Sequence, residues 1–246
     1  MGRNKTEWFA TWFDTKYYHI LYQNRDFKEA ERFITNLLNH LKLPKDSNCL
    51  DLACGKGRHA VFINKKGYSV TGVDLSENSI QEAKPFERED LKFEVHDMRE
   101  VFKTNAYDAV FNLFTSFGYF ENQGDNLKVL ESINEMLVDD GVLVIDFMNA
   151  EFVLDNLVKE ETKTLDGIQF HITRNYDGSH IFKHITFSDD GENFSFQERV
   201  QALKKEDFEM LLDKAGFTVV ESFGDFSLSP FDKHKSDRLI IIARKK

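Results

Sequence analysis

The stretch LDLACGKGRHA, residues 50–60, decides the fold class. Gly55 and Gly57 stand between a short apolar run, typical of a buried strand, and a segment with the apolar spacing of a helix. Glycines in such a turn let the backbone bend tightly and approach a ligand without a Cβ clash. The stretch therefore matches the glycine-rich fingerprint of dinucleotide sites, and it leaves open a different adenosine compound held by the same kind of turn.

Short apolar runs alternate with helical patterns on both sides of the glycine turn. This alternation predicts an α/β fold with a doubly wound, mostly parallel sheet of seven strands. The last two strands are expected to pair as a hairpin at one edge of the sheet. The expected strands are 48–54, 68–76, 91–98, 107–114, 141–149, 217–224 and 238–245, and the expected helices are 26–41, 57–67, 77–84, 126–141 and 205–216.

The pattern changes after Asn149, where three stretches show period-two alternation and are separated by the turns DGS and DDGEN. Such alternation predicts antiparallel strands. Because this segment is too short to carry its own core comfortably, we interpret it as an insertion in a single domain. The predicted organisation is one domain, 1–246, with a helical lid at 1–43, a cofactor-binding core at 44–149 and 204–246, and an antiparallel insertion at 150–203 that roofs the substrate site.

Two acidic residues follow the glycine turn at the ends of successive expected strands. Asp74 lies about 20 residues beyond the turn, where a carboxylate can accept both ribose hydroxyls. Asp97 ends the next strand, where it can accept a hydrogen bond from an adenine amino group. Since ligands of parallel α/β sheets bind at the carboxyl edge, the three features predict one adenosine site.

In these residues the chain resembles the class I S-adenosylmethionine-dependent methyltransferases, over residues 45–149 and 204–246. LDLACGKGRH resembles their first motif, GVDLS the second and HDMR the third, while NLFTSFGYF at 112–120 resembles the fourth, which passes the methionine moiety. Ala53 departs from the family's usual glycine. The resemblance implies S-adenosylmethionine as cofactor, S-adenosylhomocysteine as product, and a cofactor site made of Tyr18, Arg25, Asp51, Ala53, Cys54, Gly55, Gly57, Asp74, Leu75, Asp97, Met98 and Asn112.

The aromatic N-terminus, with YYHILYQNRD at 17–26, resembles the lid helices of small-molecule N- and O-methyltransferases of this class. The resemblance implies that Tyr18 and Tyr22 reach over the methionine end and that Arg25 pairs with the methionine carboxylate. A general base is needed only where the acceptor loses a proton early. The candidates for that role are Tyr18, Tyr22, Tyr119 and His184, with His171 and His180 on the same inserted strands.

Composition and charge exclude several classes of substrate and binding partner. The formal net charge of −10 and the absence of an Asn-Pro-Pro-Tyr motif after the fourth strand argue against a nucleic-acid substrate. No signal peptide or apolar run of about 20 residues stands in the sequence, so we expect a cytoplasmic protein without membrane contact. The two cysteines have no metal-type spacing. A closed roof suits a small-molecule acceptor. We expect the protein itself to be a monomer or a homodimer.

Two other functions remain open from the sequence. An NAD-dependent oxidoreductase would hold a pyrophosphate at the same turn, but Asp51 would then lie near phosphates and repel them. A binding protein could keep the cofactor fold without catalysis. We expect instead transfer of a methyl group to an N or O atom of a small molecule by in-line displacement, and no residue identifies the acceptor.

Overall fold

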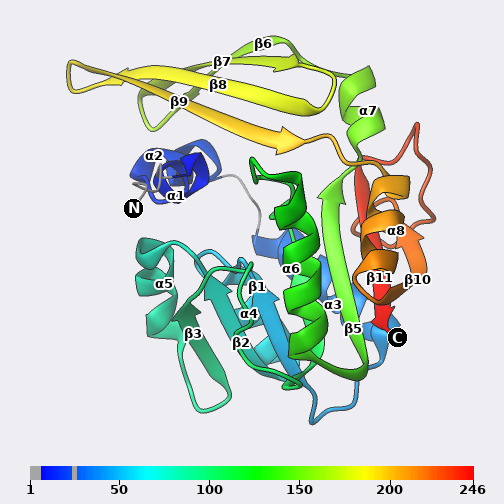
Figure 1. Cartoon of the computed structure of the whole chain (residues 1–246). Helices are drawn as coiled ribbons and strands as arrows, with labels where there is room; N and C mark the ends of the chain where they lie inside the picture. The colour runs from blue at the N-terminus through cyan, green and yellow to red at the C-terminus, as the bar shows by residue number, and fades with distance from the viewer. Residues whose placement is uncertain (1–6, 24–26) are drawn as a thin grey trace, which may run out of the picture.

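The computed structural model describes residues 7–23 and 27–246, and its centre is a seven-stranded sheet of order β10-β11-β5-β4-β1-β2-β3 (Figure 1). The prediction of a doubly wound, mostly parallel sheet is confirmed, because only β11 runs against the other strands, pairing antiparallel with β10 on one side and β5 on the other. The strands are β1 Asn48–Leu52, β2 Ser69–Asp74, β3 Leu91–Val95, β4 Tyr107–Asn112, β5 Leu137–Met148, β10 Phe217–Phe223 and β11 Arg238–Lys245.

Helices cover both faces of this sheet because neighbouring residues of each strand point to opposite sides. On β4, the buried Val110 belongs to the apolar cluster that contains Leu130 of α6 and Phe208 of α8. The next residue, Phe111, belongs to the opposite cluster, with Ile34 of α3. The helices are α3 Phe27–Leu41, α4 Arg58–Lys65, α5 Glu77–Ala83, a 3₁₀ turn η1 Lys84–Phe86, α6 Gln123–Met136, α7 Ala150–Asp155 and α8 Lys205–Lys214.

The boundary between α6 and β5 differs from the expected one. The sequence predicts a helix through residue 141, whereas α6 ends at Met136 and β5 already begins at Leu137. The reason is pairing with the sheet, because Leu137 is buried and lies opposite Tyr107 of β4. The chain then turns through Asp140, which has a positive φ of 59°.

The insertion forms a separate antiparallel sheet of order β6-β7-β8-β9, comprising Glu160–Leu165, Ile168–Tyr176, His180–Asp189 and Glu192–Gln201. Three of these strands agree with the expected ones. β6 was not expected, because its sequence EETKTL is almost entirely polar and exposed and carries no apolar alternation. It is held instead by its pairing with β7.

The N-terminal helices lie between the second sheet and the carboxyl edge of the first (Figure 1). They are α1, Trp8–Trp12, and α2, Lys16–Leu21. Their buried residues Trp12, Tyr17 and Leu21 share one apolar cluster with residues of β7 and β8 such as Ile172 and Phe187. The lid and the second sheet are therefore one packed unit. No helix in the described part of the chain is long and apolar enough to cross a membrane.

Candidate active site

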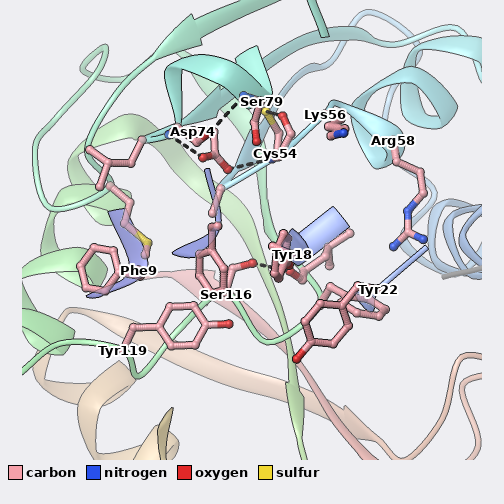
Figure 2. Close-up of a pocket in the computed structure, with 18 of the residues that line it drawn as sticks. Phe9, Tyr18, Tyr22, Cys54, Lys56, Arg58, Asp74, Ser79, Ser116 and Tyr119 are labelled. Carbon is pink, nitrogen blue, oxygen red and sulfur yellow. Dashed lines mark hydrogen bonds between the residues drawn. The ribbon is translucent and has the colours of Figure 1, made fainter. Parts of the chain in front are cut away.

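A cavity of about 400 Å³ lies at the carboxyl edge of the seven-stranded sheet, beneath α1 and α2. This volume falls within the range of about 300–1,000 Å³ that is usual for small-ligand sites. Its walls come from the glycine turn after β1, the ends of β2 and β3, the loop after β4, the lid and β9 (Figure 2). The expected site residues that line it are Tyr18, Tyr22, Ala53, Cys54, Gly55, Asp74, Leu75, Asp97, Met98 and Tyr119.

The glycine turn presents an open surface at one glycine and a packed one at the other. Gly55 has φ +55°, and a Cβ added there would meet no atom within 4 Å, so this position faces open space. Gly57 has φ +78°, and its Cβ would lie 2.5 Å from the Phe93 ring. Gly57 is thus needed for packing beneath the turn and does not line the cavity. Ala53 also has a positive φ, of 62°, in the region that glycine adopts most readily and that is unfavourable for alanine.

Asp74 is fixed by the backbone of the turn it faces. Its carboxylate accepts one hydrogen bond from the Gly55 N–H at 2.8 Å and another from the Ser76 N–H at 2.8 Å. Burial raises its pKa, and these two N–H groups partly oppose that rise. Figure 2 shows the carboxylate beside the glycine turn, on the cavity wall. A carboxylate retains further lone pairs when it accepts two bonds, so Asp74 can also accept bonds from ligand hydroxyls.

Asp51 does not line the cavity, although the resemblance implies a place for it in the cofactor site. It is 1 % exposed, and its carboxylate accepts a hydrogen bond from the Ala60 N–H at 2.9 Å. Burial raises the pKa of Asp51 to about 7, and the bond from Ala60 only partly opposes the rise. Its visible role is to satisfy a backbone donor in the first turn of α4.

Asp97 lines the cavity and belongs to a network of charged side chains that the sequence did not indicate. The Arg99 guanidinium binds the Asp97 carboxylate, with Nη2 to Oδ2 at 2.6 Å, and also binds Glu7, which precedes α1. Burial would raise the pKa of Asp97, but the Arg99 hydrogen bonds outweigh it and lower that pKa. Arg99 thereby joins the lid to the end of β3.

Asn112 connects two of the strands whose ends carry the site. Its side chain is fully buried, and its amide donates to the Leu52 carbonyl at 3.1 Å, which ties the ends of β4 and β1 together. Asn112 itself does not line the cavity, but Leu113, Phe114 and Ser116 of the same loop do.

The wall opposite Asp74 is aromatic, and Figure 2 shows Tyr22 and Tyr119 on it. The Tyr22 hydroxyl donates to Glu198 of β9 at 2.7 Å and accepts from the Lys183 ammonium of β8 at 2.6 Å. Trp12 of the lid donates to the same carboxylate through Nε1 at 2.8 Å. Glu198 lines the cavity, and it was not predictable from the sequence because it lies 176 residues from Tyr22.

His184 lies outside this arrangement. It is exposed on the face of β8 that points away from the lid, and its Nε2 is 3.3 Å from the Gln197 amide. The buried face of the same strand carries Ile185 and Phe187. The histidines that line the cavity are instead His19, His59 and His96. Arg25 falls outside the described residues, and the described cations that line the cavity include Lys56 and Arg58.

Comparison with known proteins agrees with the geometry. A family model described as "Methyltransferase domain" matches residues 22–222, which is most of the chain. The chain belongs to the S-adenosylmethionine-dependent methyltransferases. Within this methyltransferase family, the chain is 27 % identical over 242 residues to the glycine/sarcosine N-methyltransferase of Aphanothece halophytica, covering 92 % of this chain and 85 % of that one.

Two further similarities also cover most of the chain. The chain is 26 % identical over 212 residues to the dTDP-3-amino-3,4,6-trideoxy-alpha-D-glucopyranose N,N-dimethyltransferase of Streptomyces venezuelae, covering 82 % of this chain and 89 % of that one. A solved structure of an S-adenosylmethionine-dependent methyltransferase from Clostridium acetobutylicum superposes with a TM-score of 0.78 at 20 % identity. It covers 93 % of this chain and 96 % of that one, and it supports the methyltransferase fold.

Proposed function

We propose that this methyltransferase transfers the methyl group of S-adenosylmethionine to a nitrogen or oxygen atom of a small-molecule acceptor. The observation that carries the proposal is the aromatic wall of the cavity, where Tyr18, Tyr22 and Tyr119 line the same cavity of about 400 Å³ as the glycine turn. A roof of this kind leaves room for a small acceptor and excludes a polymer. The two curated relatives named above, which by their names methylate glycine, sarcosine and an amino sugar, favour nitrogen.

The proposed cofactor contacts follow the order of the strands. Asp97 and Met98 after β3 would hold the adenine, Asp74 after β2 the ribose, and the turn around Gly55 the centre of the molecule. When bound, S-adenosylmethionine supplies a methyl group that its sulfonium activates for displacement. Along the same edge, the next strand is β4, so the methionine end would lie at Phe114 and Ser116.

The chain's own contribution to the reaction is proximity and exclusion of water. Groups that hold an acceptor within attack distance of the methyl carbon remove much of the entropic barrier, and an aromatic wall beside the acceptor limits hydration of the nucleophile. We assign to Tyr22 the task of orienting the acceptor and relaying its proton: the hydroxyl oxygen would take the acceptor's proton as the hydroxyl's own proton passes to the Glu198 carboxylate to which it is hydrogen-bonded. Tyr18 and Tyr119 complete the wall.

Calorimetry with S-adenosylmethionine and S-adenosylhomocysteine tests the cofactor site first. We expect both to bind to the full chain, and binding of neither would contradict the proposal. Transfer of a radiolabelled methyl group to glycine, sarcosine, the amino sugar nucleotide and matched hydroxyl compounds then tests the acceptor class. Transfer only to a protein or RNA from a cell extract would contradict the small-molecule assignment.

A further inference from the structure

The loop after β4 adopts a backbone conformation that its residues do not favour. Phe114 has φ +65° and Thr115 has φ +61°, so two successive residues with β-carbons lie in the left-handed region. This region is unfavourable for any residue other than glycine, asparagine or aspartate, and such residues concentrate at functional sites. Phe114 and the following Ser116 both line the cavity.

A buried ion pair holds this loop in place. The carboxylate of Asp146, on β5, accepts from the Phe114 N–H at 2.9 Å, and the Asp146 carbonyl accepts from the Thr115 N–H at 2.8 Å. Arg238, the first residue of β11, donates to the same carboxylate at 2.8 Å and to the Thr115 hydroxyl at 3.1 Å. The Asp146 side chain is 0 % exposed and the Arg238 side chain 15 %.

Arg238 also packs against the ring that faces the cavity. Its guanidinium carbon lies 5.7 Å from the centre of the Phe114 ring, within the range of a cation–π contact. The pair therefore holds the backbone of Phe114 and contacts its side chain, whose ring also lies 5.2 Å from the Arg58 guanidinium carbon. Neither Asp146 nor Arg238 lines the cavity, so they act on a ligand only through the loop.

We infer that Asp146 and Arg238 are positioning residues for the amino-acid end of the cofactor, and that they hold the loop 114–116 in the shape that receives it. The inference rests on the proposed function, because it uses the order of contacts along β3, β2, β1 and β4. The adenosine half, held by Asp74 and the glycine turn, lies on strands that this pair does not touch.

Two ligands separate this role from a general contribution to folding. S-adenosylhomocysteine carries the amino-acid end, whereas 5′-methylthioadenosine keeps the adenine, ribose and sulfur and lacks that end. We expect Arg238→Met to weaken binding of S-adenosylhomocysteine about tenfold or more and to change binding of 5′-methylthioadenosine by less than about twofold. Asp146→Asn should also weaken binding of S-adenosylhomocysteine, because Arg238 loses its counter-charge. The amide oxygen can still accept the Phe114 N–H.

Matched variants keep the test decisive if Arg238→Met is unstable. Arg238→Lys retains the charge without the planar fork and should restore part of the binding. Arg244→Met removes an arginine of the same strand that bonds the Asp140 carbonyl on the exposed surface, and it should bind both ligands like the wild type. Equal losses for both ligands, or no loss for either, would overturn the inference. A wild-type chain that binds neither ligand would overturn the proposed function with it.

Discussion

We name two regions after their proposed roles: the nucleotide edge, made of the turns after β1, β2 and β3, and the acceptor wall, made of the lid and the second sheet. The two regions are built differently. At the nucleotide edge, backbone groups fix the polar side chain, as when the Gly55 and Ser76 N–H groups hold Asp74. At the acceptor wall, side chains fix one another across the fold, as when Trp12 and Tyr22 bond to Glu198. The first arrangement is encoded locally and the second depends on the tertiary fold.

This difference has a functional consequence. A cofactor site formed by backbone turns tolerates few changes at the turn itself, because every change alters the approach of the ligand. An acceptor wall formed by side chains can change one residue at a time while the cofactor site stays intact. Substitutions should therefore separate into those that abolish cofactor binding and those that affect only the acceptor.

The largest effect on binding is expected from Gly55→Val. The new side chain would project into open space at the cavity rather than into protein, so it should exclude the ligand. We expect affinity for S-adenosylhomocysteine, measured by calorimetry, to fall about 100-fold or more, equivalent to about 3 kcal/mol. Gly167→Val is the control, because Gly167 also has a positive φ and open surroundings but lies in the β6–β7 turn. Both variants should lose about 1–2 kcal/mol of stability to backbone strain, and equal affinities would contradict the assignment of the turn.

Asp51→Asn should alter the pH dependence of stability and leave binding within about twofold. The pKa of Asp51 is raised from 3.8 to about 7 in the fold, so between these values the native state binds a proton that the unfolded chain releases. Stability of the wild type therefore falls as pH rises through this window, and the contribution of Asp51 is on the order of a few kcal/mol. The asparagine variant, which can still accept the Ala60 N–H, should show a shallower fall.

Urea unfolding of the cofactor-free chain at several pH values between 4 and 8 measures this slope. The exposed Asp46→Asn variant serves as the control and should follow the wild type. Both variants should keep some dependence of stability on pH, because burial also raises the pKa of Asp74 and of Asp146. Identical slopes for Asp51→Asn and the wild type would contradict the assignment.

The fold and the nucleotide edge were largely predictable because their signals are local. The alternation of strands and helices predicted the main sheet, and the spacing from Gly55 to Asp74 predicted residues that the structure brings into hydrogen-bond contact. The role of Asp51 was less accessible, since the sequence places it in the motif but does not reveal that its carboxylate turns to the Ala60 N–H. The strand β6 was missed because pairing, not apolar alternation, defines it.

The acceptor wall was largely unpredictable for a physical reason. Period-two alternation correctly separates His184 from Lys183 and Phe187 on β8, but it cannot tell which face meets the lid. Each face carries both apolar and polar residues, so the buried face is fixed only by packing against α1 and α2. Glu198 and Lys183 became visible only when β8 and β9 were brought to Tyr22.

Asp74→Ala should weaken binding of S-adenosylhomocysteine about 10- to 100-fold, equivalent to about 1.4–2.7 kcal/mol. The substitution removes the proposed ribose acceptor and leaves the Gly55 and Ser76 N–H groups without their partner. Asp177→Ala is a matched control, because Asp177 accepts N–H bonds from Ser179 and His180 in an exposed turn of the second sheet. Calorimetry should show wild-type affinity for the control, and an unchanged affinity for Asp74→Ala would refute its assignment to the ribose.

Tyr22→Phe should leave the cofactor site intact, and it is the sharpest test of the acceptor wall. Tyr22 and Tyr17 each join the lid to a carboxylate of the second sheet, Tyr22 to Glu198 at 2.7 Å and Tyr17 to Asp189 at 2.9 Å. Only Tyr22 lines the cavity. Removal of either hydroxyl should cost about 1–2 kcal/mol of stability, because each donates to a carboxylate, and Tyr22→Phe also removes the acceptor of the Lys183 ammonium.

Methyl transfer should distinguish the two tyrosine variants where unfolding cannot. We expect Tyr22→Phe to lower kcat/KM for the acceptor at least about tenfold. The reason is the loss of one oriented hydrogen bond in the transition state. Tyr17→Phe should retain wild-type kcat/KM, and both variants should bind S-adenosylhomocysteine within about twofold of the wild type. If the two variants lose activity equally, Tyr22 serves only to fasten the lid. If Tyr22→Phe alone loses activity, the lid supplies a group that acts on the acceptor, and the acceptor wall is chemically distinct from the nucleotide edge below it.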